Sequence, residues 1–155
     1  MNHTFIIGKL EANSETFKTL FSFLGKEEYL WKPNPGKWCL LEVACHLYDE
    51  EREDFRARLN HTLESPNEKL PSIDPAGWVE SRKYREQNFE IKVNNFLEER
   101  KNSVKWLNSL KKPKWENVYH HPKFGEFSAE MFLVNWLAHD YLHIRQINRD
   151  KISTP

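Results

Sequence analysis

The sequence predicts an all-α protein, and specifically a four-helix bundle. Apolar residues recur three or four positions apart in four long segments, clusters of proline and glycine separate the segments, and the alternating pattern of strands is nearly absent. Each segment runs for roughly 20 residues, against a usual helix mean of about 11–12. Few long helices around one core indicate a bundle. The chain has 155 residues, so we expect residues 1–155 to form a single domain.

The first helix is predicted over residues 3–25, where apolar residues follow the helical spacing. Gly25 is expected to end it. The next stretch, WKPNPGKW at residues 31–38, holds two prolines and a glycine and is expected to be a loop.

The second helix is predicted over residues 39–61. Pro66, Pro71 and Pro75 then mark a long connection, with a short turn of helix expected around Trp78. A connection of this length allows the chain to cross over between the second and third helices, so the topology need not be a simple up-and-down bundle.

The third helix is predicted over residues 79–110, the longest periodic run, and Pro113 stops it. Residues 121–127, HPKFGEF, read as an irregular linker. Ser128 is a plausible N-cap for the last helix, which is predicted over residues 129–149.

Composition and charge exclude several classes of function. Lysine plus arginine and aspartate plus glutamate both total 23, giving zero formal net charge, which removes the usual reason to expect a nucleic-acid partner. No apolar run approaches a membrane span, and the N-terminus does not resemble a secretory signal. Cys39 and Cys45 lie about 240° apart on one helix, so we expect reduced thiols in a cytoplasmic protein. A small-molecule substrate is the expected partner.

The segment NWLAHDYLHIRQI, residues 135–147, places His139 and His143 one turn apart. They lie about 40° apart on a helical wheel, in a stripe with Phe132 and Trp136 that faces other protein. Such a pair projects both rings to one side, where one divalent metal can bridge them. A packing or surface role is the alternative.

His46 is the candidate for a third ligand, at the edge of the apolar face of the second helix. Its neighbours on the wheel are Glu42, Asp49, Glu50 and Glu53. This acidic surround fits either a solvated face with an ordinary surface histidine or a groove whose carboxylates hold a ligating imidazole.

Three neutral imidazoles with one coordination position open describe a catalytic metal site rather than a structural one. The ligand set suits zinc, nickel or iron. The open position can bind water or a thiol and lower its pKa, and both products are nucleophiles.

Two stretches carry a resemblance that covers nearly the whole chain. WKPNPGKWCLLEVACHLYDEE, residues 31–51, and HPKFGEFSAEMFLVNWLAHDYLHIRQI, residues 121–147, resemble the two signature segments of the DinB/YfiT-like superfamily of metal-binding bundles. The second ends in the pattern H-D-x-x-H-x-x-Q-I. Together, in order and on a four-helix pattern, they are fairly specific.

The resemblance implies a bundle that is often a homodimer, with His46, His139 and His143 as metal ligands. Members with assigned activities look like metal-dependent hydrolases, or like thiol-dependent transferases or isomerases that use a low-molecular-weight thiol such as bacillithiol or mycothiol. Related iron enzymes use an H-x-x-x-H-x-E pattern. Arg145 stands at the corresponding position here, which argues against that reaction.

Three functions therefore stay open: a thiol transferase, a hydrolase with hydroxide as the nucleophile, and a non-enzymatic dimeric stress or binding protein. Glu50 is the candidate acid/base or ligand-orienting carboxylate, with Glu42 and Asp49 as competitors. Gln146 is expected to bond a ligand imidazole or cap the pocket, and Trp136 to line it.

Recognition of a thiol by the transferase would need basic residues near the metal. Arg52, Lys123 and Arg145 are the candidates, although spacing fixes none of them.

Overall fold

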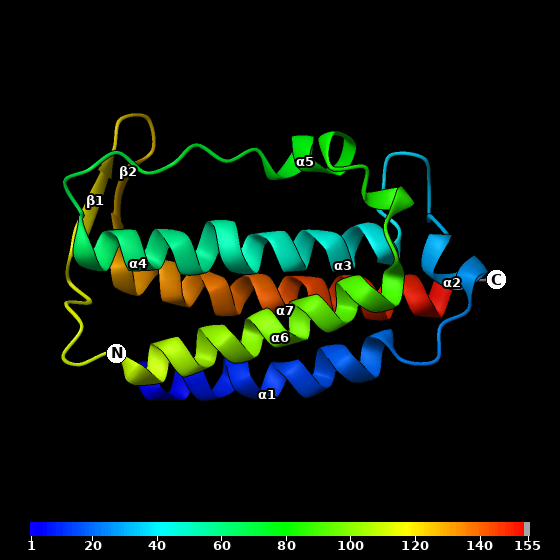
Figure 1. Ribbon diagram of the computed structural model, residues 1–155, viewed down its shortest axis with the longest axis horizontal. Coiled ribbons are helices and arrows are strands. Elements are labelled where there is room, and N and C mark those ends of the chain that lie inside the picture. Colours follow the sequence, from blue (N-terminus) through cyan, green and yellow to red (C-terminus); the bar gives the residue numbers. More distant parts are fainter. Residues whose placement is uncertain (154–155) are drawn as a thin grey trace.

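The computed structural model describes residues 1–153, and four long helical segments in that range form a bundle (Figure 1). They are α1 His3–Phe21; the continuous helix made of α3 Leu40–Asp49, η1 Glu50–Arg56 and α4 Ala57–Glu64; α6 Phe89–Ser109; and α7 Ala129–Ser153. Shorter elements connect them: α2 Lys26–Leu30, α5 Pro75–Ser81, η2 Tyr84–Glu86, β1 Val118–His121 and β2 Gly125–Ser128. The predicted four-helix fold is confirmed.

The long connection after α4 sets the direction of the third long helix. It runs back along the outside of the α3–α4 helix before the chain enters α6, so these two helices point the same way (Figure 1). The remaining pair, α1 and α7, points in the opposite direction. The predicted crossover is therefore present, because a short turn would have made the second and third helices antiparallel.

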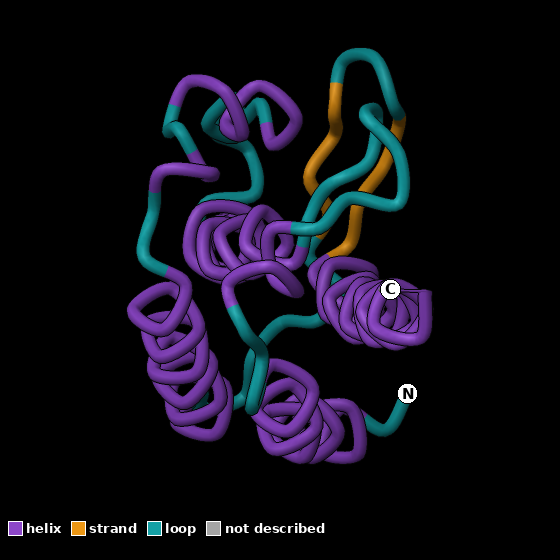
Figure 2. Tube along the Cα trace, turned by 90° about the vertical axis from the view of Figure 1, so that its right-hand side faces the viewer, coloured by secondary structure: helices purple, strands orange, loops and turns teal. Residues whose placement is uncertain are grey.

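Each long helix packs against two others. Helix α6 contacts α1 and α3, and helix α7 contacts α1 and α4. Figure 2, which looks along the bundle, shows the hairpin and the crossover on one side of it. Within residues 1–153, no helix combines the length and the apolar character that crossing a membrane requires.

Two apolar clusters fill the bundle, one toward each end. One includes Val43 and Phe96, and the other includes Leu59 and Leu133. Between them along the helices lies a layer of buried polar and charged side chains: His46, Glu50, Glu51, Arg100, Asp140 and His143. Polar groups that are buried from water need hydrogen-bond partners or a ligand, so this layer is the candidate location of a binding or catalytic site.

The second long helix contains a π-helical segment at Glu50–Arg56. The wider turn shifts the phase of the helix relative to a regular 3.6-residue period, and such turns occur frequently at functional sites. Here Asp49, Glu50 and Glu51 are all buried, although they are consecutive in the sequence. The π segment thus lets neighbouring carboxylates contact different parts of the polar layer.

The first helix ends earlier than predicted. It stops at Phe21, Phe23 adopts a left-handed backbone with φ of 60°, and Gly25 is the N-cap of α2 instead of a helix terminator. The Gly25 N–H donates to Glu28 Oε2 at 2.6 Å, which stabilises this start. The prediction of one helix over residues 3–25 was therefore wrong at its C-terminal end.

The expected helix over residues 79–110 is also divided. The predicted turn around Trp78 is present as α5, but Lys83 has a left-handed backbone with φ of 49°, and α6 begins only at Phe89. The Asn88 side chain accepts from Ile91 N–H at 2.9 Å and caps the new start. The apolar spacing suggested one helix over residues 79–110, but the cap at Asn88 begins a separate helix within that range.

Residues 121–127 form most of a β-hairpin instead of an irregular linker. In the antiparallel pairing, Tyr119 faces Phe127, and Gly125 supplies the left-handed φ of 86° that closes the three-residue loop. Strands of four residues leave too short an alternation to detect from sequence. Ser128 Oγ accepts from Met131 N–H at 3.1 Å, as its predicted capping role requires.

Candidate metal centre

Three histidines from two helices converge in the polar layer. His46 lies on α3, while His139 and His143 lie one turn apart on α7. His139 Nε2 lies 3.2 Å from His46 Nε2 and 3.1 Å from His143 Nε2. One ring nitrogen of each histidine lies within 4.8 Å of the others. The structure thus brings together the three residues that the sequence singled out as metal ligands.

All three imidazoles are held in the neutral form that binds metals. Burial lowers the pKa of His46 to about 3, with a further contribution from His143. Burial is also the main cause that lowers the pKa of His139 and of His143. Neutral rings at neutral pH present a lone pair without first losing a proton.

Gln146 fixes the tautomer of one ring. Its Oε1 lies 2.9 Å from His143 Nδ1 and can only accept, so Nδ1 carries the proton and Nε2 presents the lone pair. This is the contact that the sequence proposed for Gln146. By contrast, His46 Nδ1 is buried without a hydrogen-bond partner in the described chain.

Aromatic rings restrict the orientation of the imidazoles. The Trp38 ring lies 4.7 Å from that of His46, and the Phe55 ring lies 4.9 Å from that of His139, measured between centroids. Trp136 stacks on Phe55 at 5.8 Å and is 1% exposed, so it supports the site from behind Phe55 and does not line it.

Glu50 is the carboxylate that faces the cluster. Its Oε2 lies 3.9 Å from His139 Nε2. Burial, reinforced by the neighbouring Asp54 carboxyl, raises the pKa of Glu50 to about 8. Burial likewise raises the pKa of Asp54, which is paired with Arg58 Nε at 2.7 Å. A ladder of Glu50, Asp54 and Arg58 therefore leads away from the histidines along one helix.

The competing carboxylates are engaged elsewhere. Glu42 pairs with Lys32 Nζ at 2.8 Å and accepts from the Cys39 N–H at 2.7 Å, so it caps α3. Asp49 accepts from the Tyr84 hydroxyl at 2.7 Å and also pairs with two arginines, Arg52 and Arg82.

The three basic candidates for thiol recognition are not gathered at the cluster. Arg52 is held by Asp49 at 3.0 Å and by Glu53 at 2.8 Å. Lys123 lies over the Phe124 ring in the hairpin loop, and Arg145 is exposed on α7.

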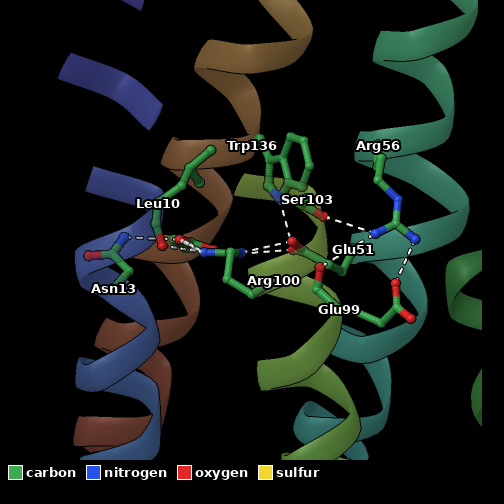
Figure 3. A network of polar contacts seen from close by, with 9 residues as sticks. Leu10, Asn13, Glu51, Arg56, Glu99, Arg100, Ser103 and Trp136 are labelled. Carbon is green, nitrogen blue, oxygen red and sulfur yellow. Dashed lines mark hydrogen bonds and ion pairs between the residues drawn. The ribbon is translucent and has the colours of Figure 1, made fainter. Parts of the chain in front are cut away.

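Sequence reasoning missed a second buried cluster, the Arg100 network (Figure 3). Arg100 is 1% exposed and uses all five of its N–H groups on three acceptors. It binds Glu51 at 2.8 and 2.9 Å, Asp140 at 2.6 and 2.7 Å, and the Leu10 carbonyl oxygen at 3.1 Å. Since these groups come from all four long helices, one guanidinium connects the whole bundle.

The remaining acceptor capacity of the Arg100 network is also used. Trp136 Nε1 donates to Glu51 Oε2 at 2.9 Å, and Asn13 Nδ2 donates to Asp140 Oδ2 at 2.9 Å. Asp140, which by its sequence could be an ordinary surface residue, is completely buried. A signal was present: Arg100 lies four residues from both Phe96 and Val104, on the apolar stripe of its helix.

The Arg100 network and the histidine cluster are adjacent along the chain. Asp140 follows His139, and Glu51 follows Glu50. Because Arg100 binds both Glu51 and Asp140, it also fixes the positions of the two histidine-bearing helices relative to each other along the bundle axis.

The residues of the histidine cluster fit a divalent cation. Each neutral imidazole can offer one ring-nitrogen lone pair, and the three nitrogens lie within 4.8 Å of one another, as the ligands of a single ion do. No fourth histidine, cysteine or acidic residue joins this group among residues 1–153. Three protein ligands leave a coordination position open, which is the arrangement of catalytic and not of structural sites.

A four-helix bundle with a buried polar layer and three converging histidines defines a metal-binding bundle protein. The family model of the DinB superfamily matches residues 9–147, so the chain belongs to that superfamily. No curated protein sequence matches the chain.

A solved structure gives the same fold. YfiT from Bacillus subtilis, described as a probable metal-dependent hydrolase with an unusual four-helix bundle topology, superposes with a TM-score of 0.84. The alignment covers 96% of this chain and 85% of that chain, at 17% sequence identity. At this identity the likeness establishes the fold alone.

Proposed function

We propose that the protein is a metal-dependent enzyme in which His46, His139 and His143 hold a divalent cation: zinc, nickel or iron. The observation that carries this proposal is the position of His139 Nε2, which lies 3.2 Å from His46 Nε2 and 3.1 Å from His143 Nε2, with Glu50 beside it. Its reaction is transfer of a low-molecular-weight thiol, such as bacillithiol, to an electrophilic small molecule.

The three imidazoles would hold a divalent cation, which would lower the pKa of a thiol or a water molecule at the open position. The residues of the chain do the rest. A cation beside Glu50 would favour its ionised form, whose Oε2 can then accept the thiol proton. Gln146 keeps the His143 ring oriented through Nδ1. The sulfur then forms a bond to carbon, while the leaving group departs with the electron pair of the broken bond.

The first test is metal content by elemental analysis, on tag-free wild type and on His46→Ala. We expect about one ion per chain in wild type, since three ligands form one site, and loss of that ion in the variant. His120→Ala is the matched control, because His120 is exposed on the outer face of the hairpin. Absence of metal from wild type, even after incubation with divalent ions, would overturn the proposal.

The second test separates the reactions. Metal-loaded protein is given a low-molecular-weight thiol with 1-chloro-2,4-dinitrobenzene, and separately an activated ester without thiol. Thiol transfer predicts conjugate formation that Glu50→Gln slows by about 10²–10⁴-fold, the usual contribution of a general acid or base. Ester cleavage without conjugate formation would instead identify a hydrolase.

The hydrolase is the second candidate, and the likeness to YfiT favours it, because that protein is described as a probable metal-dependent hydrolase. In this reaction Glu50 accepts a proton from water, and the same residues hold the cation. Absence of turnover with metal bound would favour the third candidate, a stress or binding protein.

We also propose that the protein is a homodimer. Met131 and Leu142 lie about 20° apart on the outer face of α7 and are 44% and 65% exposed, with Tyr141 beside them at 47%. Sedimentation velocity should give a dimer for wild type and a monomer for Leu142→Glu. A monomeric wild type would reject this assembly without affecting the metal proposal.

A further inference from the structure

A second feature lies at the end of the bundle that carries the hairpin. It is a cavity of about 470 Å³, enclosed by α4, α7, the crossover segment at residues 69–73 and the hairpin. Its size falls in the range of pockets that hold small organic molecules. We refer to it as the hairpin pocket.

One wall of the hairpin pocket is aromatic. Tyr119 and Phe127 pair across the hairpin, and the Phe127 ring stacks on Phe132 of α7 at 5.7 Å. His121 lies 4.7 Å from Phe124, which is 65% exposed although it belongs to this wall. The opposite face of the hairpin carries the exposed polar pair of His120 and Glu126. The hairpin thus presents its apolar face to the pocket.

The hairpin pocket has basic side chains and no acidic one, and its Ser72 and Tyr119 hydroxyls can donate as well as accept. Arg58, Lys69 and His121 line it, and no aspartate or glutamate is among its lining residues. Arg58 is tied to Asp54 through Nε, and its two terminal nitrogens make no hydrogen bond to the described chain. His121 Nδ1 accepts from the Lys123 and Phe124 N–H groups at 3.0 and 3.1 Å, so the neutral ring carries its proton on Nε2 and offers a donor there.

The hairpin pocket and the histidine cluster lie along the same two helical segments, α7 and the α3–α4 helix. Phe132 and His139 lie about 20° apart on the α7 wheel and about 10 Å apart along its axis. On the α3–α4 helix, the ladder of Glu50, Asp54 and Arg58 runs from the cluster to the pocket, which Arg58 lines. The pocket and the histidines are therefore separated by about two turns of helix, a distance comparable to the length of a small metabolite.

We propose that the hairpin pocket binds the organic substrate, an amphipathic carboxylate whose aromatic or other apolar body lies against the hairpin and whose carboxylate is held by Arg58. The two terminal nitrogens of the Arg58 guanidinium match a planar carboxylate, and the aromatic wall matches the apolar body. Identifying the occupant as the substrate rests on the proposed function, whereas binding to the pocket does not.

The test compares 2-naphthoate with 2-naphthamide, which share one body and differ in charge, by isothermal titration calorimetry in EDTA. We expect wild type to bind the carboxylate about tenfold or more tightly than the amide, as a charge-assisted hydrogen bond predicts. Arg58→Gln should bring the two affinities together. Arg56→Gln is the control, because Arg56 is an arginine two residues away that faces Glu99 on α6.

Phe124→Ala tests the wall without disturbing the core, since that side chain is exposed. It should weaken the carboxylate and the amide by the same factor. Equal binding of both compounds to wild type, binding of neither, or a preference that survives Arg58→Gln would overturn the inference.

The same titrations on His139→Ala distinguish this inference from the proposed function. Retained naphthoate binding in that variant supports the pocket independently of any metal. If wild type binds metal and turns over thiol but shows no preference for naphthoate, the pocket inference alone is wrong.

Discussion

The Arg100 network and the histidine cluster are both buried at mid-height in the bundle, yet their polar groups are satisfied in different ways. Arg100 has an acceptor for every N–H, and both of its carboxylate partners receive further donors. In the histidine cluster, three neutral nitrogens face one another, and His46 Nδ1 is a buried orphan. The network is complete as protein alone, whereas the cluster has the donor set of a ligand site.

The difference separates stability from function. A fully paired buried network stabilises one arrangement of helices, and removing one member leaves an uncompensated charge. A cluster of unpaired buried imidazoles carries a cost that a bound cation can offset. Mutations in the Arg100 network should therefore lower the free energy of unfolding, whereas mutations in the histidine cluster should lower metal binding.

The largest expected effect is that of Arg100→Leu, which leaves Glu51 and Asp140 buried without their cation. We expect a loss of about 3–5 kcal/mol in the free energy of unfolding, measured by urea denaturation in EDTA. Arg56→Leu is the control. Its ion pair with Glu99 is partly exposed, so the expected loss is about 0–1 kcal/mol. Equal losses in the two variants would contradict the special role of the Arg100 network.

The second effect concerns metal-linked stability. At a free zinc concentration of 100 times Kd, wild type should gain about 2.7 kcal/mol of unfolding free energy, because the cation binds only the folded site. His139→Ala should gain nothing, while the exposed-histidine variant His120→Ala should gain as much as wild type. Denaturation curves with and without metal measure both, and a gain in His139→Ala would show that the ion binds elsewhere.

A smaller effect is expected for Gln146→Leu. Without the acceptor for Nδ1–H, the His143 ring loses its fixed tautomer, and metal affinity should fall about 10–100-fold. Competition with a chromophoric chelator measures the affinity, and unfolding in EDTA should change little because Gln146 is half-buried. Asn148→Leu, an exposed position one turn from Ile144, is the matched control. If the metal affinity of Gln146→Leu were unchanged, the hydrogen bond between Gln146 and His143 would have no role in metal binding.

The smallest effect is expected at the cysteines. Both are free and buried, and burial raises the pKa of Cys45 to about 12 and also raises that of Cys39. Neither should react with Ellman's reagent at pH 8 in the native protein, although both should react after unfolding. Rapid reaction of a cysteine in the native protein would contradict this expectation. It would mean that the chain has a reactive nucleophile outside both the Arg100 network and the histidine cluster.

The sequence was informative wherever the signal was local. Helical spacing, the caps and the i, i+4 pair of His139 and His143 are properties of short stretches, and they predicted the bundle and most of the candidate site. The predictions failed at Gly25 and over residues 82–88, where the choice between continuing and restarting a helix depended on competing caps.

The sequence by itself determined four amphipathic helices and a histidine pair on one face of the last one, because periodicity and spacing fix which side chains share a helix face. Only the tertiary structure decided which carboxylate meets the histidines, which charges Arg100 binds, and that residues 118–128 pair as a hairpin. These contacts join residues far apart in the chain, and the π segment at Glu50–Arg56 alters the helical phase on which a sequence-based wheel depends.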